Sequence, residues 1–338
     1  MREIRIGGGG LAGLALGIGL RQRGVPVTIH EAGRYPRHRV CGEFISGVGE
    51  PTLKRLGITE AIHAGEPLET AHWYVGGGSP APMRVPGGAR GISRWTLDQR
   101  LASDFEGLGG VLRTDSRVTD DLAGAGWVHA SGRERVPGVS RWIGLKLHVH
   151  GLPLTAGLEM HVGRFGYCGL SRIEAGRVNV CGLFRRDRRV RARGPALLGK
   201  YLRSSGLGKL AGRIEAADPD ASSVCGTSAF RFGKQPGGGL RIGDADRMIP
   251  PFTGNGMSMA FEAAECALEP LSRYAGGGSS WEAATGEVRS ALAHRFARRV
   301  RVARLLHPLL LHPWGIGLAA GWVRSGNLPF EAICRWMR

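Results

Sequence analysis

A glycine-rich turn near the start of the chain has the spacing that holds a dinucleotide. Gly8, Gly10 and Gly13 match G-x-G-x-x-G. In this pattern the first glycine permits a tight turn, the second lets a pyrophosphate approach the backbone, and the third lets a helix pack on a strand. The helix N-terminus that follows would carry a partial positive charge toward the phosphates, so Leu11 and Ala12 are also predicted to contact them.

An acidic residue stands where the second part of such a unit needs one. A strand is predicted over residues 25–30, and Glu31 follows it, 18 positions after Gly13. A carboxylate there can accept hydrogen bonds from the hydroxyl groups of an adenosine ribose, with Ala32 beside it. The pattern predicts dinucleotide binding, but by itself it does not distinguish NAD from FAD.

A second glycine-containing segment, residues 240–264, can bind the other end of a flavin dinucleotide. A short strand ends at Gly243 and Asp244, a loop with proline and glycine follows, and a helix of small residues begins near Gly256. The Asp244 carboxylate can bind a ribityl hydroxyl. The helix N-terminus can stabilise the negative charge that appears at the flavin N1 on reduction. The residues assigned to this half of the site are Gly243, Asp244, Gly254, Asn255, Gly256 and Met257.

Two further segments contain residues that can reach the same ligand. The loop at residues 34–46 is basic and includes Arg39 before a Cys41-Gly42-Glu43 turn. Arg94 stands just ahead of a predicted helix and can hold a phosphate or the edge of the isoalloxazine. A surface role for either arginine, and a packing role for Cys41, remain open at this point.

The elements that position these residues are recognisable from periodicity. A strand over residues 3–6, a helix over residues 14–20 and the strand over residues 25–30 form a strand, turn, helix and strand in order. Residues 158–162 and 178–181 alternate between apolar and polar types, which is typical of antiparallel strands that are covered on one face.

The motifs together, in their order along the chain, resemble the FAD-dependent monooxygenase and geranylgeranyl reductase superfamily. The resemblance covers residues 1–265. It rests on the Gly8 turn with Glu31, on Cys41-Gly42-Glu43, on Arg94 with Leu97-Asp98, on Ala130-Ser131-Gly132, on Gly243-Asp244 and on Pro251-x-x-Gly254-x-Gly256.

The resemblance implies an α/β fold in which the FAD-binding domain is Rossmann-like and discontinuous. We expect that domain to comprise residues 1–70, 92–140 and 236–270. An inserted antiparallel β-sheet domain for substrate is expected from residues 71–91 and 141–235, and a C-terminal helical region from residues 271–338.

The activity implied is that of a monooxygenase, in which NADH or NADPH reduces FAD and dioxygen supplies the oxygen that hydroxylates or epoxidises a small hydrophobic or aromatic molecule. Because the sequence has no second G-x-G-x-x-G unit, the nicotinamide is expected to bind transiently. Pro251, Gly254 and Asn255 are the implied catalytic residues, together with Cys41. The Ala130-Ser131-Gly132 segment lacks the acidic residue that many hydroxylases carry there.

Three other functions are compatible with the fold to different degrees. A reductase of the geranylgeranyl type would use Cys41 to assist protonation of an alkene. A flavin-binding module without turnover would act through a partner. Halogenation is disfavoured, because the Trp-x-Trp-x-Ile-Pro element of tryptophan halogenases is absent. The residues considered for proton transfer in any of these reactions are His148, His150, Glu159, His161 and Tyr167.

The composition limits the classes of partner that the protein can bind. A formal charge of +18 would suit nucleic acid, an anionic membrane or an acidic carrier protein, but no nucleic-acid motif or zinc-ligand spacing accompanies it. We therefore expect no nucleic acid and no metal. A basic stripe in the C-terminal helices is formed by Arg295, Arg298, Arg299, Arg301 and Arg304. It is interpreted as a solvated helix face that caps the substrate pocket, with contact to a carrier protein or membrane surface as the alternative. Six dispersed cysteines and a strand that starts close to Met1 favour a cytoplasmic protein.

Overall fold

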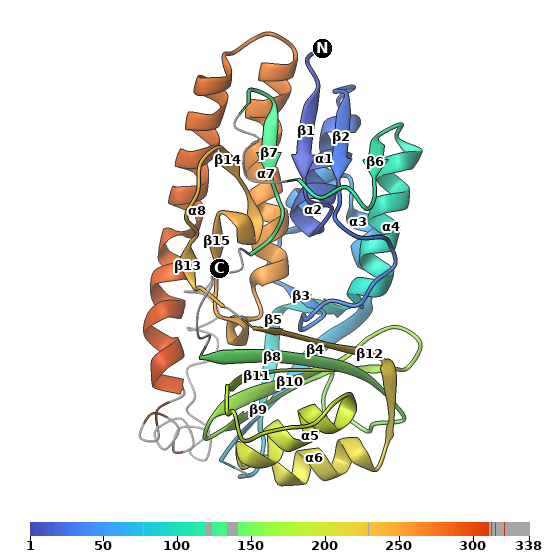
Figure 1. Cartoon of the computed structure of the whole chain (residues 1–338), viewed down its shortest axis with the longest axis vertical. Helices are drawn as coiled ribbons and strands as arrows, with labels where there is room; N and C mark the ends of the chain where they lie inside the picture. Colours follow the sequence, from blue (N-terminus) through green and yellow to red (C-terminus); the bar gives the residue numbers. More distant parts are fainter. Residues whose placement is uncertain are drawn as a thin grey trace.

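In the part of the chain that it describes, the computed structural model has a five-stranded, an eight-stranded and a small two-stranded β-sheet, with helices packed on the two larger ones (Figure 1). It describes residues 1–76, 78–118, 124–133, 141–228 and 230–310, together with 312, 315 and 321. Most of the helical region predicted beyond residue 310 therefore lies outside the described residues. No helix in the described part of the chain is long and apolar enough to cross a membrane.

The first sheet is five-stranded and parallel, and it carries the N-terminal glycine turn. Its order is β14 (Leu240–Arg241), β7 (Trp127–His129), β1 (Ile4–Gly7), β2 (Val27–His30) and β6 (Val111–Arg113). The segment that returns from residue 240 thus joins the same sheet as β1. This pairing brings the two glycine segments, more than 200 residues apart, to one sheet.

The helix after the first glycine turn is buried on all sides because small residues let its neighbours approach. Helix α1 (Leu11–Arg21) packs between α4 (Arg94–Gly107) and α7 (Gly256–Ala275). A Cβ on Gly17 would lie 2.8 Å from Ile29 and 2.9 Å from Phe105. Glycine at this position therefore permits the close packing of α1 on the sheet and on α4.

The second sheet has eight strands, in the order β12-β8-β11-β10-β9-β4-β5-β3. Its strands are β3 (Phe44–Ser46), β4 (Glu66–Val75), β5 (Ala81–Gly91), β8 (Trp142–His150), β9 (Leu158–Gly163), β10 (Gly166–Arg172), β11 (Val178–Arg185) and β12 (Asp218–Ser228). All neighbours are antiparallel except β4 and β9, which are parallel. The expected antiparallel sheet is therefore mixed, because β4 and β9 belong to separate excursions of the chain joined by a long crossover.

The two faces of this sheet have different neighbours. Along β8, Leu145, Leu147 and Val149 pack against α5 (Pro195–Ser204) and α6 (Gly208–Glu215). The residues between them point to the opposite face, toward the parallel sheet, since side chains alternate along a strand. In Figure 1 the helices α5 and α6 lie below the sheet and the parallel sheet lies above it.

Helix α8 (Trp281–Leu310) runs along the side of both layers (Figure 1). Its arginines do not form the uniform basic stripe expected from sequence. The buried Arg299 lies 2.8 Å from Glu262 of α7, and Arg295 lies 3.3 Å from the same carboxylate. Arg298, Arg301 and Arg304 are exposed. The stripe is divided because the α7 carboxylates attract the arginines on one side of the helix.

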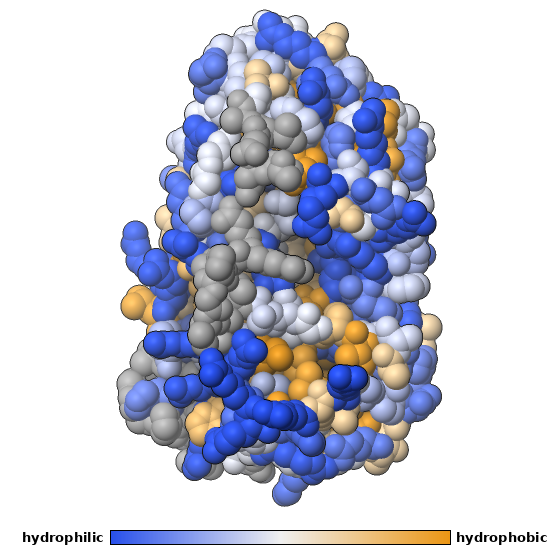
Figure 2. All heavy atoms as spheres, viewed as in Figure 1, coloured by the Kyte–Doolittle hydropathy of each residue, from blue (hydrophilic) through white to orange (hydrophobic). Residues whose placement is uncertain are grey.

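Short elements complete the described chain. They are α2 (Glu50–Leu56), α3 (Thr59–His63), β13 (Gly233–Lys234), β15 (Arg247–Met248), η1 (Gly243–Ala245) and η2 (Pro251–Thr253). Figure 2 shows hydrophobic residues gathered in the lower half of one face, over the eight-stranded sheet, with hydrophilic residues around them.

Candidate functional site

The three motif glycines of the first turn differ in what surrounds them. Gly8 has a φ of +117°, and a Cβ on it would lie 2.6 Å from the Cα of Ser131. A Cβ on Gly13 would collide with the carbonyl oxygen of Gly8. Gly10, the N-cap of α1, has ordinary extended backbone, and a Cβ there would meet nothing within 4 Å. Packing thus explains Gly8 and Gly13, whereas Gly10 leaves open space in front of a helix N-terminus.

Glu31 is buried beside this turn and is already bound by backbone amides. Its carboxylate accepts hydrogen bonds from the N–H of Gly9 at 2.9 Å and from the N–H of Gly33 at 3.0 Å. Arg37 lies 2.6 Å and Arg39 3.5 Å from the same carboxylate. Glu31 is therefore fixed at the end of β2, where a ribose would be recognised in this type of turn.

A chain of buried charges links the loop at residues 34–46 to α4. Asp98 is fully buried and lies 2.6 Å from Arg94 and 2.9 Å from Arg39. Burial raises the pKa of the Cys41 thiol, while the positive charge of Arg94 opposes this shift. Arg39, Cys41 and Arg94, predicted from three separate segments, thus belong to one cluster. Asp98, which joins the two arginines, received no role from sequence.

The Cys41-Gly42-Glu43 turn connects this cluster to the eight-stranded sheet. Glu43 is completely buried, with Oε2 2.6 Å from Nε2 of His148 and Oε1 3.3 Å from Nζ of Lys146. The carbonyl of Gly42 accepts a hydrogen bond from Ser171 at 2.9 Å. The turn is therefore held against the sheet at several points, and Glu43 and Lys146 are site residues that sequence reasoning left without a role.

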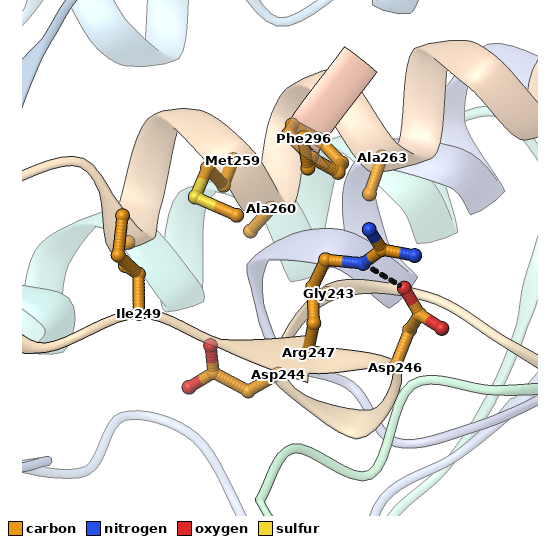
Figure 3. Close-up of a pocket in the computed structure, with 10 residues that line it drawn as sticks. Gly243, Asp244, Asp246, Arg247, Ile249, Met259, Ala260, Ala263 and Phe296 are labelled. Carbon is orange, nitrogen blue, oxygen red and sulfur yellow. Dashed lines mark hydrogen bonds and ion pairs between the residues drawn. The ribbon is translucent and has the colours of Figure 1, made fainter. Parts of the chain in front are cut away.

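The second glycine segment lies against the start of α1. A Cβ on Gly243 would lie 3.0 Å from the Cβ of Ala12, so the two turns meet. Burial raises the pKa of Asp244 to about 6, although the positive charges of Arg94 and Arg133 oppose the shift. In Figure 3 the Asp244 carboxylate points away from the ion pair between Asp246 and Arg247, which lines the same small pocket.

The loop that precedes α7 is held in place by packing at Gly254 and by a hydrogen bond at Phe252. Gly254 has a φ of +65°, and a Cβ on it would fall on the ring of Phe44. The backbone N–H of Phe252, next to Pro251, donates a hydrogen bond to the hydroxyl of Tyr167 at 3.1 Å. Asn255 is buried as the N-cap of α7, and Gly256 at the first turn would place a Cβ in open space. Met257 is buried in the core between the five-stranded parallel sheet and its helices, which we call the nucleotide layer.

The proton-transfer candidates divide between the two faces of the eight-stranded sheet. His148 and Tyr167 face the nucleotide layer. His148 is hydrogen-bonded to Glu43, and Tyr167 is hydrogen-bonded to the backbone of Phe252. Glu159 and His161 pair with each other at 2.9 Å, and Arg213 of α6 lies 3.0 Å from Glu159, so both lie on the far face. Burial by itself would raise the pKa of Glu159, but hydrogen bonds from His161 and Arg213 outweigh this effect and lower the pKa to about 2.

His150, the remaining candidate, is exposed at the end of β8. Alternation along β9 points Glu159 and His161 toward α6, so the structure does not bring these two candidates to the face that carries His148 and Tyr167.

The residues present fit a dinucleotide such as FAD. Two helices, α1 and α7, begin with glycines whose missing Cβ atoms leave open space, at Gly10 and Gly256. Helix N-termini favour negative charge such as a pyrophosphate or a reduced flavin. Asp244 lines one pocket with Gly256, and its neighbour Gly243 contacts Ala12 of α1. Its carboxylate is able to accept hydrogen bonds from a ribityl chain.

One cluster has the ligand types of a metal site. Ligand atoms of His38, His148 and Asp220 lie within 4.8 Å of one another. The Nζ of Lys146, however, lies 3.1 Å from Nδ1 of His38. Because an ammonium group at this distance repels a divalent cation, we assign no metal to the cluster.

The fold was compared with known proteins. No protein-family model and no curated protein sequence matches the chain. Among solved structures, the flavin-dependent brominase Bmp2 matches with a TM-score of 0.77 and 18% identity, covering 99% of this chain and 93% of that one. PqsL, a probable FAD-dependent monooxygenase from Pseudomonas aeruginosa, matches with a TM-score of 0.70 and 16% identity, covering 95% and 100%.

A geranylgeranyl bacteriochlorophyll reductase-like protein from Thermoplasma acidophilum matches with a TM-score of 0.73 and 16% identity, covering 99% of this chain and 95% of that one. These TM-scores establish a common architecture. The chain therefore has the fold shared by FAD-dependent monooxygenases and geranylgeranyl reductase-like flavoproteins.

Proposed function

We propose that the protein is an FAD-dependent monooxygenase that takes electrons from NADH or NADPH and hydroxylates or epoxidises a small hydrophobic or aromatic molecule, in polyketide or isoprenoid metabolism. The observation that carries this proposal is the pair of helix N-termini at Gly10 and Gly256, each open in front, with Asp244 lining the same pocket as Gly256. Bound FAD would supply the redox chemistry and the site for dioxygen.

The chain's own residues would bind and orient the cofactor and keep water out. The amides at the start of α1 would hold the pyrophosphate, and those at the start of α7 would face the pyrimidine end of the flavin. Arg39 and Arg94 are held by Asp98, so their positive charges are fixed before the cofactor arrives. The apolar face of the sheet near Tyr167 and Phe252 would exclude water from the reacting atoms.

The proposal is tested by purifying the protein and recording its visible spectrum, then following NADPH oxidation with and without air. We expect a bound yellow flavin, and product that carries labelled oxygen from ¹⁸O₂ when aromatic polyketides or polyprenyl compounds are offered. A colourless protein that takes up no FAD would contradict flavin binding. Product that forms equally well without oxygen would contradict oxygenation.

A second candidate, a C=C reductase, is favoured by one observation at Cys41. Burial raises the pKa of this thiol, so it stays protonated near neutral pH and can donate a proton. In this reaction reduced FAD would give a hydride to one carbon of an alkene and Cys41 would give a proton to the other. Saturated product formed under argon, with Cys41→Ser impaired, would establish the reductase in place of the monooxygenase.

Replacing Asp244 by asparagine is expected to change FAD affinity and apoprotein stability in opposite directions. Unfolded aspartate ionises near pH 4, whereas burial raises the pKa of Asp244 to about 6. The ligand-free fold therefore loses stability between pH 4 and pH 6, and the loss persists at higher pH. Asp244→Asn should stabilise the apoprotein by about 1 to 2 kcal/mol at pH 7.5, with little effect at pH 4, since partial solvation reduces the full penalty.

The same variant should bind FAD about tenfold more weakly, because a charge-assisted hydrogen bond to the ribityl chain is lost. Urea unfolding at the two pH values and FAD titration measure both effects. The control is Asp218→Asn at an exposed position of β12. Equal stabilisation at pH 4 and pH 7.5 would show that the carboxylate charge is not the cause.

A further inference from the structure

An aromatic cluster is enclosed between the eight-stranded sheet, the Pro251 loop and the end of α8. Tyr167 and Phe252 are among its buried members, and Trp142 and Phe232 pack against them. We call these four residues the aromatic cluster. It lies on the face of the sheet that is turned toward the nucleotide layer, where the proposed substrate would meet the flavin.

His307 of α8 is inserted into the aromatic cluster. Its ring centroid lies 5.3 Å from that of Trp142, 5.0 Å from Phe232 and 5.8 Å from Phe252. Tyr167 approaches it edge-on at 6.3 Å. The side chain is 7% exposed, so an imidazole is surrounded by rings on several sides.

The Nε2 atom of His307 is buried and has no hydrogen-bond partner among the described residues. Buried polar atoms are almost always paired, because burying one without a partner costs roughly 1–3 kcal/mol. Burial also lowers the pKa of His307 to about 4, so the ring is neutral at physiological pH. A neutral, unpaired nitrogen inside an apolar cluster destabilises the fold unless a bound molecule forms a hydrogen bond with it.

A second polar atom of the aromatic cluster has hydrogen-bonding capacity left. The hydroxyl oxygen of Tyr167 accepts the hydrogen bond from the N–H of Phe252 at 3.1 Å. Burial raises the pKa of this phenol well above its usual value, so it keeps its proton. A phenol that accepts one hydrogen bond can still donate another. Both polar groups are uncharged, which favours an uncharged molecule.

We propose that Nε2 of His307 is the hydrogen-bonding group that recognises the substrate, and that the substrate is an uncharged, flat aromatic molecule with a hydroxyl group. This inference rests on the proposed function and adds the substrate class to it. A hydroxyl both donates and accepts hydrogen bonds, so it suits either tautomer of the imidazole. The rings of Trp142, Phe232 and Phe252 provide the apolar surface on which an aromatic ring packs.

The test compares 2-naphthol with naphthalene and 2-naphthoate, which share the ring system but carry a hydroxyl, no polar group and a charge, respectively. Their dissociation constants are measured by equilibrium dialysis with the FAD-loaded protein and with the apoprotein. The wild type is expected to bind 2-naphthol about tenfold more tightly than naphthalene, and 2-naphthoate more weakly than 2-naphthol.

His307→Phe keeps a ring of similar size and removes the nitrogen. It should abolish the preference for 2-naphthol and, because an unpaired buried nitrogen disappears, raise the melting temperature of the ligand-free protein. His307→Gln should restore part of the preference. A histidine with only a structural role would leave the preference for 2-naphthol unchanged in His307→Phe, whatever the change in melting temperature. The matched control is His294→Phe, at an exposed position of the same helix.

An unchanged preference in His307→Phe would overturn the inference, as would a wild type that binds none of the probes or prefers 2-naphthoate. The experiment distinguishes these outcomes from a failure of the proposed function. A protein that binds no FAD contradicts the flavoenzyme proposal, while the apoprotein titrations still report whether His307 selects the hydroxyl.

Discussion

Replacing Gly10 by valine is expected to weaken FAD binding by about 100-fold or more, equivalent to ~2.7 kcal/mol, while leaving the ligand-free fold intact. The backbone at Gly10 has φ of −86° and ψ of −172°, which valine adopts without strain. A Cβ there meets no protein atom within 4 Å, so the added methyl groups would occupy the space required by the pyrophosphate. Titration of apoprotein with FAD and urea unfolding measure the two quantities.

Two further variants separate this effect from a general effect of losing glycine. Gly212→Val, in α6 on the far face of the eight-stranded sheet, also adds side chain to open space and should leave FAD affinity unchanged. Gly13→Ala should destabilise the apoprotein itself, because its Cβ collides with the carbonyl of Gly8. Normal FAD affinity in Gly10→Val would show that the cofactor does not approach this turn.

Replacing Glu43 by alanine is expected to lower the free energy of unfolding by about 3 to 5 kcal/mol. Glu43 and Lys146 are both completely buried and 3.3 Å apart, so the variant leaves the ammonium group without its anionic partner. His148 loses its hydrogen-bond partner in the same step. Urea denaturation of the apoprotein at neutral pH measures the loss.

The matched control removes both charges together. Glu43→Leu combined with Lys146→Met leaves no unpaired ion, and it should recover most of the stability that Glu43→Ala loses. A double variant as unstable as Glu43→Ala would show that the burial of an unpaired charge is not the cause. Because the Cys41-Gly42-Glu43 turn is anchored through this pair, Glu43→Ala should also weaken FAD binding.

The glycine turns and the fold were predictable because their signals are local in the sequence. Gly8, Gly10 and Gly13 lie within six consecutive residues, and each constraint on them arises from the immediate turn, strand and helix. The α/β architecture follows from the order of such elements, and solved structures with the same fold confirm it. The functional roles of the predicted site residues remain predictions.

The buried ion network was not predictable, because its members are distant in the sequence. Glu43 and His148 are separated by 105 positions, and no periodicity indicates which histidine an acidic residue will meet. His307 was missed for the same reason, since it belongs to a helix whose sequence gives no sign of an aromatic enclosure. The parallel pairing of β4 with β9 also depends on tertiary packing.

The alternation that includes Glu159 and His161 is visible in the sequence, but the side of the sheet to which each residue points is not. They alternate along β9 with Met160 and Val162, which belong to the apolar group that includes Phe252. Residues of opposite parity on one strand face opposite sides of the sheet. Once Met160 is placed on the nucleotide side, Glu159 and His161 must point away from it.

The same alternation gives the eight-stranded sheet two faces, one toward the proposed substrate site and one packed on α5 and α6. On β10, Tyr167 faces the nucleotide layer while Cys168 and Leu170 belong to the core with α5 and α6. On β11, Leu183 and Phe184 are divided in the same way. Under the proposed function, every second position of these strands could change with a new substrate, while the intervening residues keep the sheet attached to its supporting helices.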